Sequence, residues 1–154
     1  MRLWIAFLGV VSLAASMTAL AQDSTHSVVG TWTLNVAKSK YNPGPAPKSE
    51  TRTYEATPDG VRMTSHVESA DGQSQTVTVT FKADGKPYPE TGNPRVDTVK
   101  VTRVNARESR ATEMRDGKVV GYMTRILSRD GKVMTMTFNM IDPKGHDVRV
   151  YDRQ

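Results

Sequence analysis

The chain has 154 residues, no cysteine and a formal net charge of +5. Without cysteine, disulfides, a thiol nucleophile and a thiolate metal site are excluded. Lys and Arg are spread along the chain without a basic run, so the composition does not indicate a nucleic-acid-binding protein.

Residues 1–21 have the pattern of a secretory signal peptide. A short positive start is followed by an apolar run at 3–11, and small residues stand at 19 and 21 before the expected cleavage site at Gln22. A retained membrane anchor is the alternative, but the apolar run is shorter than the ~20 residues that a span needs. We therefore expect a periplasmic or secreted protein without a membrane span. Its single domain would be residues 22–154, with a net charge of +4 because the leader contains one Arg and no acid.

The expected mature chain has the pattern of an all-β domain. Asp-Gly pairs, which provide the positive φ of tight hairpin turns, recur at 59–60, 71–72, 84–85, 116–117 and 130–131. The segments between them are rich in Val, Thr, Tyr and Met and mostly alternate between apolar and polar residues. Nine strands are expected, at about 28–37, 49–56, 61–68, 73–82, 96–104, 106–115, 118–127, 132–140 and 146–153. Local connections favour a single antiparallel meander barrel of about 8–10 strands, because closure removes exposed edges, and a β-sandwich is the alternative.

Period-two alternation predicts which side chains face the core. The expected inward sets are Trp32, Leu34 and Val36; Val77, Val79 and Phe81; and Met134, Met136, Phe138 and Met140. Strand 106–115 is poor in apolar residues on both faces, which predicts an edge strand or a polar part of the interior. On the last strand, the same rule turns Val148 and Val150 inward and Arg149 and Tyr151 toward solvent.

Two connections are longer than hairpin turns. The first runs from Lys38 to Lys48 and the second from Lys86 to Arg95, and each contains three prolines. Proline favours an extended, stiff segment over a helix. In a meander of nine strands these are the first and fourth connections, so they are expected at opposite ends.

The first strand opens with Gly30-Thr31-Trp32, which resembles the Gly-x-Trp signature of lipocalins and fatty-acid-binding proteins, the calycin group. This resemblance implies a lipocalin-like barrel in which Trp32 closes one end beneath the final strands. In the last strand, Arg149-Val150-Tyr151 resembles the Arg-x-Tyr pair that holds a ligand carboxylate in many fatty-acid-binding proteins. The helix-turn-helix lid of that family has no counterpart, because the proline-rich stretch 42–47 stands in its place.

Over nearly the whole mature chain, the sequence is also similar to small exported bacterial proteins of uncharacterised function. The motifs that carry this resemblance are 30–35, 43–45, 84–89, 91–94, 130–132 with 134–135, and 150–152. The resemblance implies export and a similar domain, and it implies no activity.

No motif for catalysis, a metal or a cofactor is recognised. His26, His66 and His146 lack the spacing of a metal site, and the sequence has no nucleophile elbow and no Gly-rich phosphate loop. An enzyme would need buried Arg, Glu or His side chains from separate strands that converge on a cavity. No catalytic residue, metal or cofactor is therefore predicted.

The expected function is binding of a small apolar or amphipathic ligand in a barrel cavity, by a monomer or weak dimer. Methionine adapts to irregular apolar shapes, and an aromatic or Arg side chain can hold a polar group. The candidate ligand-binding residues are Trp32, Tyr122, Arg125, Met134, Met136, Phe138, Arg149 and Tyr151. The alternative is a protein-interaction module or inhibitor without a cavity, which would use the Pro/Tyr-rich loops 41–47 and 87–94.

Overall fold

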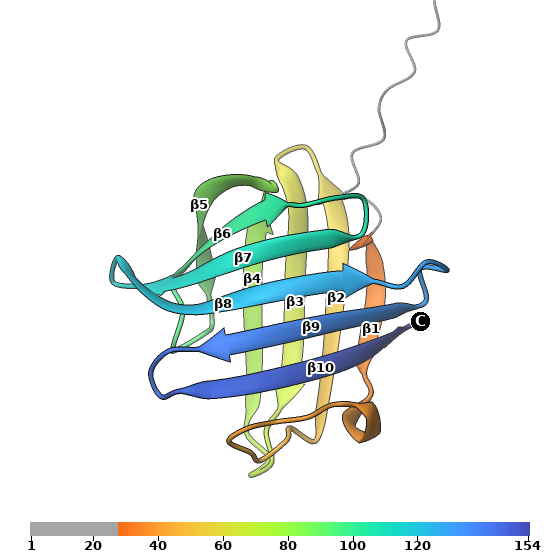
Figure 1. Cartoon of the computed structure of the whole chain (residues 1–154), viewed down its shortest axis with the longest axis vertical. Coiled ribbons are helices and arrows are strands. Elements are labelled where there is room, and N and C mark those ends of the chain that lie inside the picture. The colour runs from red at the N-terminus through yellow and green to blue at the C-terminus, as the bar shows by residue number, and fades with distance from the viewer. Residues whose placement is uncertain (1–27) are drawn as a thin grey trace, which may run out of the picture.

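The computed structural model describes residues 28–154, and its ten strands form a closed antiparallel barrel. The predicted leader 1–21, the cleavage site at Gln22 and His26 lie outside the described residues. Each strand pairs with its neighbour in sequence, and β1 closes the barrel on β10. The strands are β1 (Gly30–Leu34), β2 (Ser49–Thr57), β3 (Gly60–Glu68), β4 (Ser74–Phe81), β5 (Asp84–Thr91), β6 (Thr98–Arg103), β7 (Glu108–Arg115), β8 (Lys118–Leu127), β9 (Val133–Met140) and β10 (Gly145–Arg153), with one 3₁₀ turn, η2 (Val36–Lys38), after β1. Figure 1 shows β2–β4 crossing β7–β10 at a large angle. The barrel prediction is confirmed, and the sandwich alternative is wrong.

Strand β5 is the strand that the sequence analysis assigned to a loop. Glu90 N donates to Asp97 O at 2.8 Å, so alternate N–H groups of β5 face β6 and the nitrogens of Pro87 and Pro89 face β4. On that side the ladder has only two residue pairs, Thr78↔Thr91 and Val79↔Glu90. The prolines therefore lie where the sheet needs no backbone donor, which is how a proline-containing segment can be a strand.

Because β5 is an additional strand, every connection after it lies at the opposite end of the barrel from the end expected for nine strands. The β1–β2 and β5–β6 connections are the first and fifth of the meander, so they lie at the same end, and the predicted placement at opposite ends is wrong. Pro45 and Asn93, one from each connection, line the same cavity. We call this end the loop end, and the opposite end, which holds Trp32, the Trp end.

Most of the predicted core positions are confirmed. Trp32, Leu34, Val77, Val79, Phe81, Met134, Met136 and Phe138 are buried, and Met140 lines the interior cavity. Val36 is the exception at 38% exposure, because β1 ends at Leu34 and Val36 begins the 3₁₀ turn. Strand β7 lies between β6 and β8, so it is not an edge, and its inward Ser109 and Glu113 make it a polar part of the interior.

Trp32 closes the Trp end, as the Gly-x-Trp resemblance implies. Its ring has no exposed surface, and its Nε1 donates to Val28 O at 2.8 Å. The Arg153 guanidinium lies 4.2 Å from the ring centroid and donates from Nη1 to Val29 O at 2.7 Å. Gly30 makes this approach possible, because a Cβ there would lie 2.6 Å from Arg153 Nη1.

Replacing Gly30 by alanine is expected to lower the free energy of unfolding by about 2–3 kcal/mol, measured by urea denaturation. The cost combines strain at a φ of 134° with displacement of Arg153 from Trp32. The matched control is Gly117→Ala, at a φ of 75° and with no atom within 4 Å of the added Cβ. Backbone strain alone predicts about 1 kcal/mol there. Equal losses at the two positions would show that contact with Arg153 is not important.

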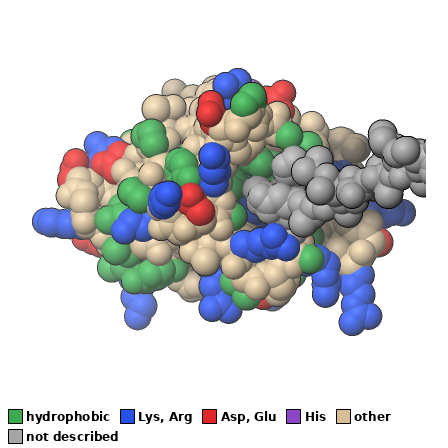
Figure 2. Space-filling view, turned by 90° about the horizontal axis from the view of Figure 1, so that it is seen from above, with side chains coloured by type: hydrophobic (Ala, Val, Ile, Leu, Met, Phe, Trp, Pro, Cys, Tyr) green, Lys and Arg blue, Asp and Glu red, His purple; other side chains and the backbone are tan. Residues whose placement is uncertain are grey.

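The outer surface has the mixed charge that the composition indicates. On the face seen in Figure 2, Lys and Arg side chains project from all parts of the outline and do not gather in one patch. Within residues 28–154, no helix is long and apolar enough to cross a membrane.

Candidate functional site

A cavity of about 890 Å³ occupies the barrel interior and extends to the loop end. Small-molecule sites in proteins commonly have volumes of roughly 300–1,000 Å³. The wall combines charged side chains with an apolar part, and the apolar part includes Met63, Val77, Val79, Phe81, Val99, Val101, Ala111, Met123, Met136, Phe138 and Met140. At the loop end, prolines at 43, 45, 47, 94 and 143 line the cavity. The interior is therefore not filled by side chains, and it has the size and the surface to hold a small apolar body.

One side of the cavity carries a buried carboxylate, Glu50 of β2. It has no exposed surface, and it accepts hydrogen bonds from Ser65 Oγ and from the Tyr151 hydroxyl, both at 2.8 Å. Arg52 Nε lies 2.5 Å from its Oε1, and Arg149 Nη1 lies 3.4 Å from its Oε2. Four donors from three strands thus converge on one carboxylate.

Asp147 completes this group, which we call the Glu50 cluster: Glu50, Arg52, Ser65, Asp147, Arg149 and Tyr151. Asp147 is 4% exposed and pairs with Arg149 Nη2 at 2.9 Å. Its other oxygen accepts from Asn42 N at 3.2 Å. Two guanidinium groups therefore face two carboxylates, and the formal charge of the cluster is zero.

The predicted orientation of the last strand is wrong. Tyr151 is fully buried, Arg149 lines the cavity, and Val148 and Val150 are half-buried on the outer side. The inward charges are tolerated because they pair with opposite charges and hydrogen-bond donors, which offsets the cost of desolvation. Lys40, which follows η2, pairs with Val148 of β10 through two backbone hydrogen bonds of 2.7 and 2.8 Å. A rule that turns apolar residues inward cannot anticipate such an arrangement.

The electrostatics of Glu50 show which effect dominates. Burial alone would raise its pKa, but Arg52, Arg149 and the hydrogen bonds from Ser65 and Tyr151 outweigh burial and hold the pKa at about 2. Burial and the nearby Glu50 charge raise the pKa of the Tyr151 hydroxyl, which therefore stays protonated and donates. Glu50 is consequently ionised at neutral pH and is held in place by its four donors.

A second polar group lies on β5 and β7. Glu90 accepts from Asn93 Nδ2 at 2.8 Å, and both Glu90 and Glu113 line the cavity. Burial raises the pKa of both carboxyls, and the charge of Glu90 raises that of Glu113 further. These two groups resist ionisation, whereas Glu50 favours it.

Replacing Glu113 by glutamine is expected to stabilise the protein increasingly as the pH rises above the ordinary glutamate value of 4.5. The raised pKa means that the folded state keeps a proton that the unfolded state has released, so the wild type loses stability as the pH increases. The glutamine variant has no such dependence at this position. Urea denaturation of both proteins across pH 4–8 measures the difference.

Glu90 provides the control for this pH effect. In a Glu90→Gln background, the pH-dependent gain from Glu113→Gln should be smaller, because burial remains and the repulsion from Glu90 is gone. A gain that decreases with pH would mean that Glu113 is held ionised, contrary to this account.

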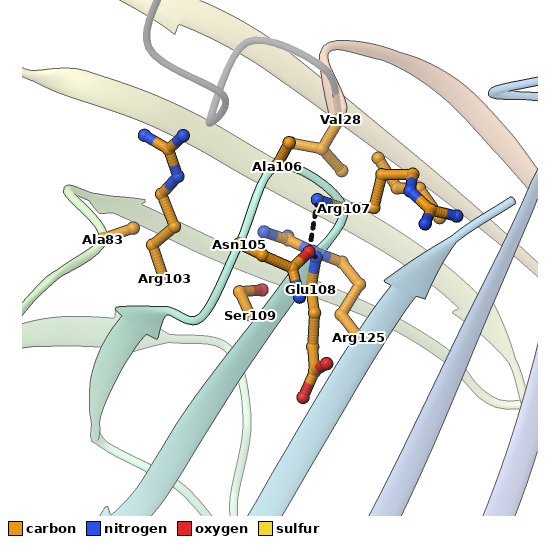
Figure 3. Close-up of a pocket in the computed structure, with 10 residues that line it drawn as sticks. Val28, Ala83, Arg103, Asn105, Ala106, Arg107, Glu108, Ser109 and Arg125 are labelled. Atoms are coloured by element: carbon orange, nitrogen blue, oxygen red, sulfur yellow. Dashed lines mark hydrogen bonds between the residues drawn. The ribbon is translucent and has the colours of Figure 1, made fainter. Parts of the chain in front are cut away.

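Arg125 of β8 lies in the wall toward the Trp end. It is 6% exposed and stacks 5.4 Å from the Tyr54 ring centroid, and within residues 28–154 it has no carboxylate partner. Its neighbour across the β7–β8 ladder is Ser109, whose buried Oγ lacks a hydrogen-bond partner in the described part of the chain. Figure 3 shows both residues in a small pocket of about 20 Å³ near Val28, with room for about one water molecule. Arg125 lines this pocket and the large cavity, so among residues 28–154 it is a buried cation on the cavity wall without an acidic partner.

The candidate residues from the sequence fall into three groups. Arg125, Met136, Phe138 and Arg149 line the cavity. Trp32, Met134 and Tyr151 are fully buried in the surrounding barrel wall. Tyr122 is 51% exposed on the outer surface, away from the cavity lining.

The polar side chains that β2 and β3 contribute to the site were not predicted from the sequence. Glu50, Arg52 and Tyr54 alternate with Thr51, Thr53 and Glu55, so neither face of β2 is apolar. That pattern could have indicated a polar interior, because every strand of a closed barrel turns one of its two faces inward. Here the inward face is the charged one.

The two histidines within residues 28–154 lie apart on the outer surface. His66 and His146 are exposed and bond to Thr76 Oγ1 and Asn139 Oδ1, respectively. Among the described residues, no group of three or more His, Cys, Asp or Glu is arranged to hold a metal ion.

Fold and site together define a ten-stranded β-barrel with an interior cavity of ligand size. Solved structures that are similar to this chain include a fatty-acid-binding protein and a fluorescent protein. A fatty-acid-binding protein of Schistosoma mansoni in complex with arachidonic acid is 20% identical, with a TM-score of 0.58 over 85% of this chain and 98% of that chain. The fluorescent protein UnaG is 23% identical, with a TM-score of 0.54 over 82% of this chain and 96% of that chain.

At these identities the comparison shows a shared fold. The chain has the barrel of the fatty-acid-binding proteins, and a single 3₁₀ turn, η2, is the helical element described between β1 and β2. No protein-family model matches the sequence, and no curated protein sequence matches it.

Proposed function

We propose that this chain is an exported, lipocalin-like binding protein that holds a small apolar or amphipathic ligand in its barrel cavity, in the periplasm or outside the cell. The observation that carries the proposal is the cavity of about 890 Å³, whose wall combines an apolar part with buried polar groups, as an amphipathic ligand requires. Two similar barrels support it, and one of them, the Schistosoma mansoni protein, is in complex with a fatty acid. Export rests on the signal-peptide pattern of residues 1–21 and on the similarity to exported bacterial proteins.

The proposed binding mode follows the chemistry of the wall. The apolar body of the ligand contacts Met136, Phe138 and the valines of β4 and β6, and Met136 adapts to its shape. A polar or anionic group of the ligand turns toward Arg125, the buried guanidinium without an acidic partner among residues 28–154. The ligand enters at the loop end, between the proline-rich segment 41–47 and the β5–β6 connection.

The interaction-module alternative is less well supported. That alternative requires a barrel without a cavity and free loops at 41–47 and 87–94. Instead, residues of the first loop line an open cavity, and residues 87–91 belong to β5. Buried Arg and Glu side chains do converge on the cavity, which is one condition for an enzyme. Their pairing with one another in the Glu50 cluster favours a structural and binding role.

Native mass spectrometry of the protein purified from its own host, beside a denatured sample, is the first test. We expect a small molecule that accompanies the native form and leaves on denaturation. If the native form is empty, titration with long-chain acids, alcohols, isoprenoids and aromatics should still quench tryptophan fluorescence or raise the melting temperature. No bound molecule and no response to the whole panel would contradict the binding function.

A further inference from the structure

The Glu50 cluster already contains the complete donor set for a carboxylate. Two guanidinium groups, a phenol and a hydroxyl are the donors that bind carboxylates most strongly in proteins. Here the carboxylate that they bind belongs to the chain, because Glu50 accepts from Ser65, Tyr151 and Arg52 at 2.5–2.8 Å. The cluster also lies on the cavity wall, since Glu50, Arg52 and Arg149 are all part of the lining.

The charge balance of the cluster leaves no attraction for a second carboxylate. Arg52 pairs with Glu50, and Arg149 is shared between Glu50 and Asp147 at 3.4 and 2.9 Å. An incoming anion would meet two buried carboxylates within the same hydrogen-bond network, and like charges at short range in a buried site repel strongly. Arg149 Nε is the buried donor of the cluster that has no partner within residues 28–154, and an anion there would lie beside both Glu50 and Asp147.

We propose that Glu50 is a specificity-determining residue, a built-in counter-ion that keeps the anionic group of a ligand away from Arg52, Arg149 and Tyr151. At this part of the wall the ligand presents apolar or uncharged polar groups, and an anionic group lies elsewhere in the cavity. This inference rests on the proposed binding function and adds the chemistry of the ligand surface that faces the Glu50 cluster.

The test compares two ligands that differ only in the polar end, hexadecanoic acid and hexadecanol, in the wild type and in Glu50→Gln. Glutamine keeps the size of the side chain and removes the charge, which leaves the cluster with one unpaired guanidinium. The acid-to-alcohol affinity ratio is expected to rise at least about tenfold in the variant, as measured by calorimetry or fluorescence displacement.

Asp71→Asn is the matched control, because it removes a carboxylate that lines the same cavity and leaves the Glu50 cluster intact. Its ratio should shift by much less than that of Glu50→Gln. Equal shifts in the two variants would overturn the proposal, since the net charge of the cavity, and not the position of Glu50, would then decide selectivity. An unchanged ratio in Glu50→Gln would overturn it as well.

A crystal structure of the wild type with hexadecanoic acid tests the proposal without any variant. The ligand carboxylate is expected away from Arg149 and Tyr151, with the bond from Tyr151 to Glu50 retained. A ligand carboxylate on Arg149 and Tyr151, with Glu50 displaced, would overturn the inference and leave the binding function standing. If neither ligand binds to any of the proteins, the inference fails, whereas the binding function is decided by native mass spectrometry and the wider ligand panel.

Discussion

Replacing Glu50 by alanine is expected to lower the free energy of unfolding by about 3–5 kcal/mol, because Arg52 and Arg149 then lose a buried counter-ion. Tyr151 and Ser65 lose their acceptor at the same time. Urea denaturation at pH 7 measures the loss. The control is Glu68→Ala, which breaks the surface pair with Lys48 at 3.4 Å, where both side chains are about half exposed. That change should cost less than about 1 kcal/mol.

The pH dependence of the Glu50 effect identifies its cause. The folded-state pKa of Glu50 is about 2, below the ordinary value of 4.5, so its stabilising contribution is fully present above 4.5 and is lost as the pH falls toward 2. The difference between wild type and Glu50→Ala should therefore shrink in acid. A difference that stays constant from pH 5 to pH 2.5 would attribute the loss to packing and not to charge.

The barrel could be predicted because its signals are local. Turns at 59–60, 71–72, 116–117 and 130–131 are marked by Asp-Gly, and all four glycines have positive φ. Alternation over a few residues gave the inward faces of β4 and β9. Strand β5 was not predicted because Pro87 and Pro89 are typical of loops. Only the structure shows that β5 has a ladder of just two residue pairs on the β4 side.

The charged part of the site could not be predicted because its partners are distant in sequence. Tyr151 and Arg149 are 101 and 99 residues from Glu50, and barrel closure alone brings them together. On β10, alternation separates the valines from Asp147, Arg149 and Tyr151 correctly. It does not say which set faces inward, and the usual preference for apolar residues gives the wrong answer when the polar set is fully paired.

Gly30 and Trp32 show what a short motif adds to hydropathy, because alternation predicts that Trp32 faces inward and the motif implies that it closes one end. Gly-x-Trp implied a closed barrel end, and Trp32 has no exposed surface there. The motif works because it combines a large ring with a glycine whose missing Cβ leaves room for Arg153 to lie over that ring. The Arg-x-Tyr pair of β10 faces inward, as its resemblance to fatty-acid-binding proteins implies. In this structure the two side chains hold the Glu50 carboxylate.

Ala111→Trp is expected to weaken the binding of hexadecanoic acid by about a hundredfold while the barrel stays folded. Ala111 is 5% exposed and lines the cavity from the middle of β7. An indole there would displace about four methylene groups of a bound chain, each worth about 0.8 kcal/mol when buried, which corresponds to a factor of roughly a hundred. Fluorescence displacement measures the affinity.

Stability measurements on the same variant test the cavity itself. If the space of about 890 Å³ is present, the indole enters it without moving the wall, and the free energy of unfolding should change by less than about 1 kcal/mol. In a filled core, the same substitution would cost about 1–3 kcal/mol through overpacking. The control is Thr112→Trp, whose side chain alternates to the outer face beside Tyr122 and should leave binding unchanged. Only Ala111→Trp reduces the interior space. Weaker binding in both variants would therefore indicate a binding site on the outer surface of β7 and β8 and contradict the cavity site.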